Sequence, residues 1–267
     1  MYQQYWGLSE RPFPSRVGLA EFFESPSHEE ALARLQFLVE QRYRVGLLLG
    51  PSGSGKSLLM NVFAQMLRRS GRKAALLSLM GQDVNGFVTQ LALQLAVEPA
   101  RRPSPEALWQ PIVDRIVANR YQRRDTVLLL DDADEAAEPV LARIVRLVEC
   151  DVSPESRLTA VVAAEKGRPH RLGRRLLDLT ELKIEIEPWT TEETAAFLRH
   201  ALSQAGRDRA IFDNGAVDRL HQLTNGVPRR ICQLAELALA AGAGQEKAEI
   251  GGETVEAVFE ELAIQVR

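Results

Sequence analysis

One eight-residue segment constrains this chain more than any other feature: Gly-Pro-Ser-Gly-Ser-Gly-Lys-Ser over residues 50–57. The apolar run over residues 44–49 before it is typical of a buried strand, and residues 57–69 after it carry apolar side chains at helical spacing. Glycines let such a loop wrap closely, so that its main-chain N–H groups converge on an anion. The segment therefore matches the phosphate-loop pattern G-x-x-x-x-G-K-[ST] in its required setting, between a strand and a helix.

The loop predicts roles for individual residues. Lys56 is expected to neutralise the β- and γ-phosphates of ATP, and the Ser57 hydroxyl to ligate Mg²⁺. The helix from Ser57 points the positive end of its dipole at the same anion. The predicted nucleotide-binding residues are consecutive: Gly50, Pro51, Ser52, Gly53, Ser54, Gly55, Lys56, Ser57 and Leu58. The alternative is a Gly/Ser-rich turn with a surface lysine.

A second motif consists of an apolar run over residues 127–130 followed by Asp131 and Asp132. Asp131 is expected to hold Mg²⁺ through water, and Asp132 to orient or deprotonate the attacking water. Taken alone, acids after an apolar strand are a weak signal, because acidic turns often follow strands. The signal is stronger here because another predicted strand, residues 74–79, lies between the two motifs. That arrangement separates ATPases with a catalytic acid from kinase-like phosphate-loop folds.

Short apolar runs alternate with helical stretches, which predicts an α/β fold: a five-stranded, mostly parallel phosphate-loop sheet with helices on both faces. The predicted strands are residues 44–49, 74–79, 127–130, 158–164 and 182–186. The predicted helices among them are residues 57–69, 84–97, 105–120 and 139–149, and a proline-containing loop over residues 98–103 separates two of these.

After Pro188 the strands stop. Thr190 and Glu193 have the spacing of a capping box, which predicts a helix to about residue 204. Three more helices are predicted over residues 214–223, 228–241 and 253–266. We therefore expect two domains: an αβα nucleotide-binding core over residues 1–187, including an N-terminal segment, and a small all-helical lid over residues 188–267.

Charge and composition exclude several classes of protein. Lys and Arg number 33 against 36 Asp and Glu, a net charge of -3, which argues against a chain that works only as an electrostatic sleeve for DNA. Cys150 and Cys232 lack metal-ligand spacing and are interpreted as buried thiols in a reducing compartment. The N-terminus lacks the pattern of a signal peptide, and no apolar run approaches the roughly 20 residues that span a bilayer. We expect a cytoplasmic protein without direct membrane insertion.

With these motifs the chain resembles the AAA+ ATPases, specifically the ExeA/GspA type associated with type II secretion. The resemblance covers nearly the whole length and extends to residues 5–13 (Tyr-Trp-Gly-Leu-Ser-Glu-Arg-Pro-Phe) and to residues 250–262. It implies that residues 27–35 lie beside the adenine, with His28 as an adenine-side or capping residue. It also implies that Gly-Val-Pro-Arg-Arg-Ile over residues 226–231 is the sensor-2 segment of the lid.

The same resemblance implies two catalytic arginines. Arg229 would reach the γ-phosphate from the lid and couple the lid angle to the nucleotide state; the alternative is a solvated arginine at a helix N-terminus. Arg175, with Arg174 next, would be the arginine finger that completes a neighbouring subunit's site. Two alternatives remain for residues 168–176: a basic patch that binds an anion, or a solvated surface.

Two positions depart from the family pattern. Asp132 stands where the family has Glu, and because its side chain is one methylene shorter, slow hydrolysis is expected while nucleotide binding survives. Glu165 stands where the family has Gln, close to the expected γ-phosphate. Such a carboxylate must either point away or be paired with an arginine, so the sensor-1 residue stays unassigned.

Three functions follow as hypotheses. The first is an ATP-hydrolysing module that self-associates into a nucleotide-dependent ring or oligomer and drives or switches a protein client, a membrane-anchored secretion component among the candidates. The second is a DNA-binding regulator similar to the TniB/TnsC transposition ATPases. The third is a nucleotide-locked scaffold in which Asp132 makes hydrolysis negligible. The basic residues available for DNA are Arg68, Arg69, Arg72, Lys73, Arg120, Arg123, Arg124, Arg168, Arg171, Arg174 and Arg175.

Overall fold

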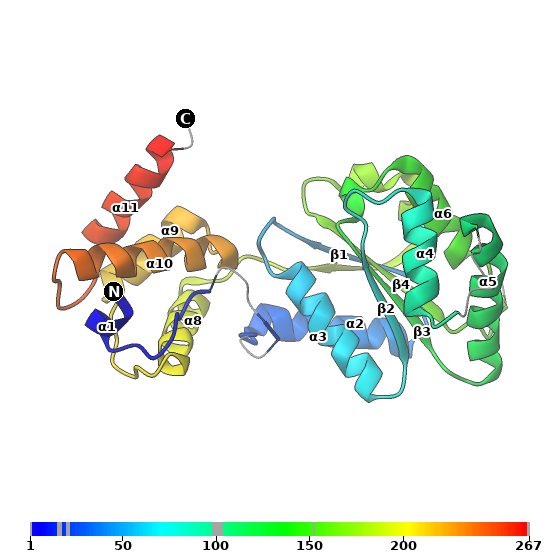
Figure 1. Cartoon of the computed structure of the whole chain (residues 1–267), viewed down its shortest axis with the longest axis horizontal. Helices are drawn as coiled ribbons and strands as arrows, with labels where there is room; N and C mark the ends of the chain where they lie inside the picture. The colour runs from blue at the N-terminus through cyan, green and yellow to red at the C-terminus, as the bar shows by residue number, and fades with distance from the viewer. Residues whose placement is uncertain (1, 15–17, 20–21, 98–103, 152, 266–267) are drawn as a thin grey trace. The chain divides into compact units, whose positions relative to one another are not determined.

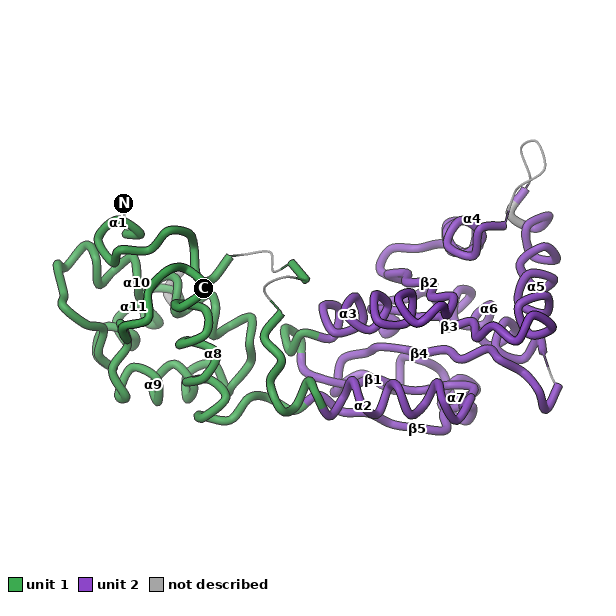
Figure 2. The backbone as a smooth tube through the Cα atoms, turned by 90° about the horizontal axis from the view of Figure 1, so that it is seen from below, with its two compact units in different colours: residues 1–29, 52–55, 187–267 green, residues 30–51, 56–186 purple. Residues whose placement is uncertain are grey.

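The computed structural model describes the chain apart from residues 1, 15–17, 20–21, 98–103, 152 and 266–267, and apart from the side chains of residues 105 and 263–265 (Figure 1). It divides into two compact units (Figure 2). The sheet unit comprises residues 30–51 and 56–186, and the helical unit comprises residues 1–29, 52–55 and 187–267. The predicted loop over residues 98–103 lies outside the described residues.

One five-stranded sheet forms the centre of the sheet unit in the described part of the chain. Its strands are β1 (Val45–Gly50), β2 (Lys73–Ser78), β3 (Thr126–Asp131), β4 (Leu158–Glu165) and β5 (Thr180–Glu185). Their order is β2-β3-β4-β1-β5, and every neighbouring pair is parallel. β1 and β3 are buried along their whole length, as expected of a sheet covered on both faces. The predicted α/β fold with a phosphate-loop sheet is confirmed.

Helices cover both faces of this sheet (Figure 1). Residues of α4 (Val84–Gln94), α5 (Pro105–Tyr121), α6 (Glu138–Val148) and α7 (Arg174–Asp178) share one core cluster with alternate residues of the strands, such as Leu47 and Leu49 of β1. The intervening Leu48 is fully buried on the opposite face, where α3 (Lys56–Arg69) and the sheet-unit part of α2 (Pro26–Glu40) pack. Because successive side chains of β1 point to opposite faces of the sheet, this strand contributes apolar side chains to the packing on each face.

The helical unit contains α1 (Tyr2–Trp6), α8 (Thr191–Gln204), α9 (Asn214–Thr224), α10 (Pro228–Gly244) and α11 (Gly252–Gln265). The predicted capping box begins α8: the Glu193 N–H donates to the Thr190 hydroxyl at 3.2 Å, and the Thr190 N–H donates to the Glu193 carboxylate at 2.8 Å. Residue 266, the predicted end of the last helix, lies outside the described residues.

The N-terminal residues depart from the predicted domain division, which placed them in the nucleotide-binding core. Trp6, Leu8 and Phe13 are buried in the core of the helical unit, and the Trp6 indole N–H donates to the Leu239 carbonyl at 2.8 Å. Burial of these apolar side chains against α8 and α10 holds residues 1–29 in that unit. The helical unit resumes at Glu187.

Several short or amphipathic elements were not predicted. They are α1, α2, α7 and two 3₁₀ turns, η1 (Ala133–Glu135) and η2 (Pro169–Leu172). The predicted helix over residues 84–97 is too long, because the backbone of Ala96 takes a positive φ of 52° after α4 has ended. The remaining elements begin and end within three residues of their predicted bounds.

Both cysteines are free thiols. Burial raises the pKa of Cys150 to about 11 and that of Cys232 to about 12, so both favour the unreactive thiol form at neutral pH. No helix in the described residues combines the length and hydrophobicity needed to cross a bilayer.

Trp6 tests how strongly the N-terminal segment stabilises the helical unit. It is 2% exposed, and Trp6→Ala is expected to lower the free energy of unfolding by about 3–5 kcal/mol through the cavity it leaves. Urea denaturation followed by circular dichroism measures this loss. Tyr121→Ala, at an exposed ring of α5, is the control and should change the free energy by under about 0.5 kcal/mol. Equal effects of the two substitutions would contradict the packing described here.

Candidate functional site

The predicted phosphate loop connects the end of β1 at Gly50 to the start of α3 at Lys56. Gly53 and Gly55 have φ angles of +86° and +93°, a conformation that residues with a Cβ rarely adopt. Residues 52–55 belong to the helical unit, whereas Pro51 before them and Lys56 after them belong to the sheet unit. The motif glycines therefore allow the chain to turn sharply at this point.

Gly53 also lies against the predicted sensor-2 segment. A Cβ at Gly53 would lie 2.8 Å from Cβ of Arg229 and 3.2 Å from Cγ1 of Val227. The Arg229 N–H donates to the Gly53 carbonyl at 3.2 Å, and the Arg229 side chain is exposed at the first turn of α10. The structure thus brings the backbone of Arg229 into contact with the loop.

Lys56 lies with its charged end against the loop. Its Nζ donates to the carbonyls of Gly50 at 2.9 Å and Pro51 at 3.1 Å. Burial lowers the pKa of Lys56, and the negative charges of nearby acids only partly oppose this effect. These acids are Asp131, Asp134, Glu165 and Asp132. A polyanion at this point would stabilise the charged ammonium.

Asp131 ends β3 and is 7% exposed. Burial raises the pKa of this carboxyl, the charge of Asp132 adds to the effect, and a hydrogen bond with the Ser57 side chain opposes it. A carboxylate and a hydroxyl held together are the oxygen ligands that Mg²⁺ prefers. The two predicted metal ligands, Ser57 and Asp131, therefore fit that ion.

Asp132 is held in place by its neighbours. Its backbone adopts the left-handed conformation (φ 53°, ψ 39°), and its N–H donates to Oδ1 of Asp131 at 3.0 Å. Its carboxylate accepts a hydrogen bond from the Ser78 hydroxyl at 3.1 Å. Ser78 ends β2 and is the register partner of Asp131, a relation that the sequence order of the strands does not reveal.

Two further acids lie in this region of the sheet unit. Asp134, on η1, is buried and acts electrostatically on Lys56; this role was not predicted, although Asp134 lies only two residues after Asp132. Glu165, at the end of β4, pairs with Arg168, whose Nε lies 3.2 Å from Oε2 of Glu165. Pairing with an arginine is one of the two arrangements predicted for this carboxylate.

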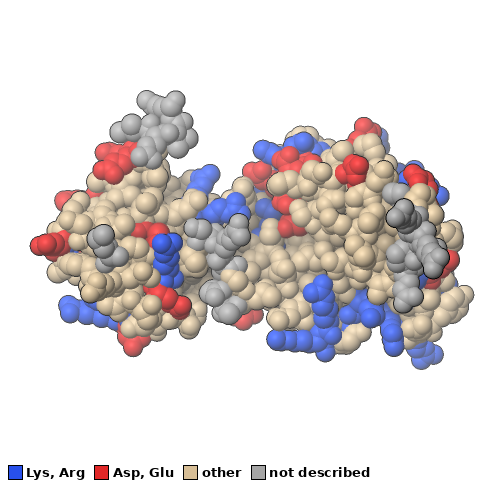
Figure 3. All heavy atoms as spheres, viewed as in Figure 1, with Lys and Arg blue, Asp and Glu red and all other residues tan. Residues whose placement is uncertain are grey.

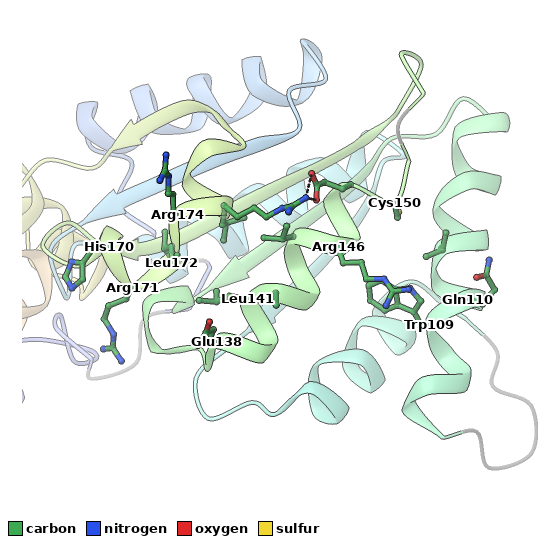
Figure 4. Close-up of a pocket in the computed structure, with 17 residues that line it drawn as sticks. Trp109, Gln110, Glu138, Leu141, Arg146, Cys150, His170, Arg171, Leu172 and Arg174 are labelled. Atoms are coloured by element: carbon green, nitrogen blue, oxygen red, sulfur yellow. Dashed lines mark hydrogen bonds and ion pairs between the residues drawn. The ribbon is translucent and has the colours of Figure 1, made fainter.

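The candidate arginine finger lies at a cavity of about 950 Å³ bounded by α5, α6, η2 and α7 (Figure 4). The Arg175 side chain is 74% exposed, and its Nη2 lies 3.0 Å from Oε2 of Glu149. Arg174 is still more exposed. The cavity also holds the Trp109 ring, over which the Arg146 guanidinium lies at 5.3 Å from the centroid. The described residues that line the cavity include none of the phosphate loop.

Known proteins are similar to this chain in sequence or in fold. The chain is 28% identical over 247 residues to general secretion pathway protein A of Aeromonas hydrophila. The matched residues cover 90% of this chain and 45% of that protein. The chain thus spans about half the length of this relative. Its fold is similar to that of Cdc6p from Pyrobaculum aerophilum (TM-score 0.70, 17% identity, 92% of this chain and 71% of that one). It is also similar to a chain of Drosophila ORC bound to DNA (TM-score 0.71, 16% identity, 98% and 66%).

A family model described as "AAA domain" matches residues 39–172, half of the chain. The matched part contains the phosphate loop, the acidic motif at the end of β3 and the four strands β1 to β4. The resemblance to AAA+ ATPases of the ExeA/GspA type is confirmed by this match and by the secretion-pathway relative. The chain belongs to the AAA domain family.

Proposed function

We propose that this chain binds ATP with Mg²⁺ at residues 50–58 and hydrolyses the nucleotide. The observation that carries the proposal is the position of Lys56, whose ammonium lies on the carbonyls of Gly50 and Pro51 at the end of β1. In the same unit the Ser57 and Asp131 side chains form a hydrogen-bonded pair that suits Mg²⁺. Together these groups match the cation, the metal ligands and the anion-binding loop that a triphosphate requires.

Each group has a distinct part in the proposed reaction. Lys56 holds the β- and γ-phosphates, and Ser57 and Asp131 hold Mg²⁺, which when bound neutralises phosphate charge. Asp132 orients the attacking water and accepts its proton. Arg229 is the proposed sensor-2 cation, and Arg175 of one copy completes the site of another.

The biological output of the proposed activity is work on, or switching of, a protein assembly in the cytoplasm. The likeness to general secretion pathway protein A supports a client of a secretion pathway, and a membrane-anchored component of such a pathway is one candidate. Self-association fits the exposure of Arg175, since an arginine finger must be reachable from a neighbouring copy.

A DNA-binding regulator is the second candidate. Figure 3 shows Lys and Arg side chains gathered along the lower edge of the sheet unit in that view. Several basic residues of the predicted clusters are nevertheless paired within the sheet unit: Arg72 with Asp125 at 3.2 Å and Arg120 with Asp151 at 2.8 Å. Such pairing lowers the charge available to phosphates, and we therefore favour the protein-assembly function.

A nucleotide-locked scaffold is the third candidate. The hydrogen bond from Ser78 to Asp132 favours it, because it occupies an oxygen of the carboxylate that would otherwise orient the attacking water.

Substitution of the loop lysine tests nucleotide binding. Lys56→Ala is expected to weaken ATP affinity at least about 30-fold, or about 2 kcal/mol, because it removes the cation that faces the triphosphate. Isothermal titration calorimetry with and without Mg²⁺ measures the change. Lys73→Ala, at an exposed lysine at the start of β2, is the matched control and should bind ATP as the wild type does. Equal affinities of wild type and Lys56→Ala would refute the proposed site.

Lengthening the acidic side chain tests the proposed base. Asp132→Glu is expected to raise the ATP turnover about tenfold or more, because the carboxylate reaches one methylene further toward the water and a positioned base contributes about 10²–10⁴-fold. Asp132→Asn should bind ATP but not hydrolyse it. Steady-state phosphate release measures both. If the wild type turns over ATP readily and as fast as Asp132→Glu, slow hydrolysis is contradicted and the locked scaffold is excluded.

Light scattering distinguishes the assembly functions. The molar mass is expected to rise with ATP and Mg²⁺ relative to ADP, and Arg175→Ala should lower ATP turnover in the assembled state. Duplex DNA added at low salt should leave the mass unchanged. An increase with DNA that disappears steeply with added salt would instead support the regulator.

A further inference from the structure

The phosphate loop has a second polar contact, made by His28 in the first turn of α2. His28 is 3% exposed, its Nε2 lies 3.0 Å from the Ser54 carbonyl oxygen, and its Nδ1 lies 2.9 Å from the Ser25 hydroxyl. Ser25 in turn accepts a hydrogen bond from the Trp189 indole N–H at 3.0 Å. All four residues belong to the helical unit.

The Ser54 carbonyl, at the end of this series of hydrogen bonds, determines the tautomer of His28. A carbonyl oxygen can only accept, so Nε2 must carry the proton. In a neutral imidazole Nδ1 is then an acceptor, and the Ser25 hydroxyl donates to it. The donors therefore run in one direction, from Trp189 to Ser25 to His28 to Ser54. Burial lowers the pKa of His28, although the Ser54 carbonyl and the Glu193 charge oppose the shift, which favours the neutral ring.

His28 was expected to lie beside the adenine or to cap a helix. The capping residue is instead Ser25, whose side chain also accepts the His28 backbone N–H at 3.4 Å. Both ring nitrogens of His28 are engaged: Nδ1 by Ser25, and Nε2 by the Ser54 carbonyl of the loop. The Phe22 and Trp189 rings, with centroids at 5.5 and 6.1 Å, pack edge-on against the imidazole and fix its plane.

The contact controls the direction of a loop amide. In a planar trans peptide the carbonyl and the following N–H point in opposite directions, so a Ser54 carbonyl held toward His28 turns the Gly55 N–H away from it. A Cβ at Gly55 would lie 2.9 Å from Nε2 of His28, so the motif glycine also makes room for the ring. The Ser54 hydroxyl is buried and has no hydrogen-bond partner in the described structure, so it does not anchor this peptide.

We propose that His28 is a positioning residue of the phosphate loop, whose neutral Nε2–H holds the Ser54 carbonyl and thereby aims the Gly55 N–H at the anion. The proposal rests on the proposed nucleotide binding at residues 50–58. It assigns Ser25 and Trp189 to the support of the ring, and it makes the geometry of the loop depend on contacts from α2 and from the chain before α8.

Calorimetry on the full chain tests this role. His28→Leu, which removes the donor at similar volume, is expected to weaken ATP affinity about tenfold or more, and His28→Gln, which retains an N–H at a similar reach, should restore it to within about threefold of wild type. His200→Leu, at an exposed histidine of α8, is the matched control and should not change the affinity. An unchanged affinity in His28→Leu, or equal losses in His28→Leu and His28→Gln, would overturn the proposal.

The outcomes separate this inference from the proposed function. A wild type that binds no ATP in a manner sensitive to Lys56→Ala refutes the nucleotide site itself, whereas wild-type binding that His28→Leu leaves intact refutes only the role of His28. Long-range ¹H–¹⁵N spectra of the wild-type imidazoles at pH 7.5 give a readout that depends on no variant. We expect the neutral Nε2–H tautomer for His28; an Nδ1–H tautomer or an imidazolium would overturn the proposal.

Discussion

The parallel direction of the strands is the constraint on which the site depends. In a parallel sheet the carboxyl ends of neighbouring strands lie at one edge. The register pairs Gly50 with Glu165 and Ser78 with Asp131, so the ends of β1, β4, β2 and β3 bring a loop, two acids and a hydroxyl to the same edge. Lys56, which begins the helix after β1, enters this group because the loop returns the chain to the sheet.

Burial at this edge shifts the pKa values of basic and acidic groups in opposite directions. It lowers the pKa of Lys56 and raises the pKa of Asp131, so both groups are shifted toward their neutral forms. Shifts of this kind gather at functional sites, because a ligand supplies the charges that the protein lacks. A nucleotide polyanion and its divalent cation are complementary to these two groups. The family to which the chain belongs and the chemistry of the site therefore support the same proposal.

Most of the sheet and the loop could be predicted because their signals are local. The apolar runs of the strands and the spacing of the phosphate loop are visible in consecutive residues. The helix α2 could also have been found, since Leu35, Leu38 and Val39 recur at helical spacing. By contrast, α1 has five residues, too few for a periodic signal or for stability in isolation, and it forms because Trp6 packs in a distant core. Ser78 was missed because the adjacency of β2 and β3 is a property of the sheet.

The amino-acid sequence by itself determined which groups are available for chemistry, because the phosphate loop with its lysine and hydroxyl follows one apolar strand and the two aspartates follow another. Only the tertiary structure decided what holds those groups in place. The hydrogen bonds from His28 to Ser54 and from Arg229 to Gly53, and the burial of the N-terminal residues, join positions far apart in the chain. Their formation depends on the packing of whole elements, and the free energy of that packing comes from buried surface that no local pattern of residues specifies.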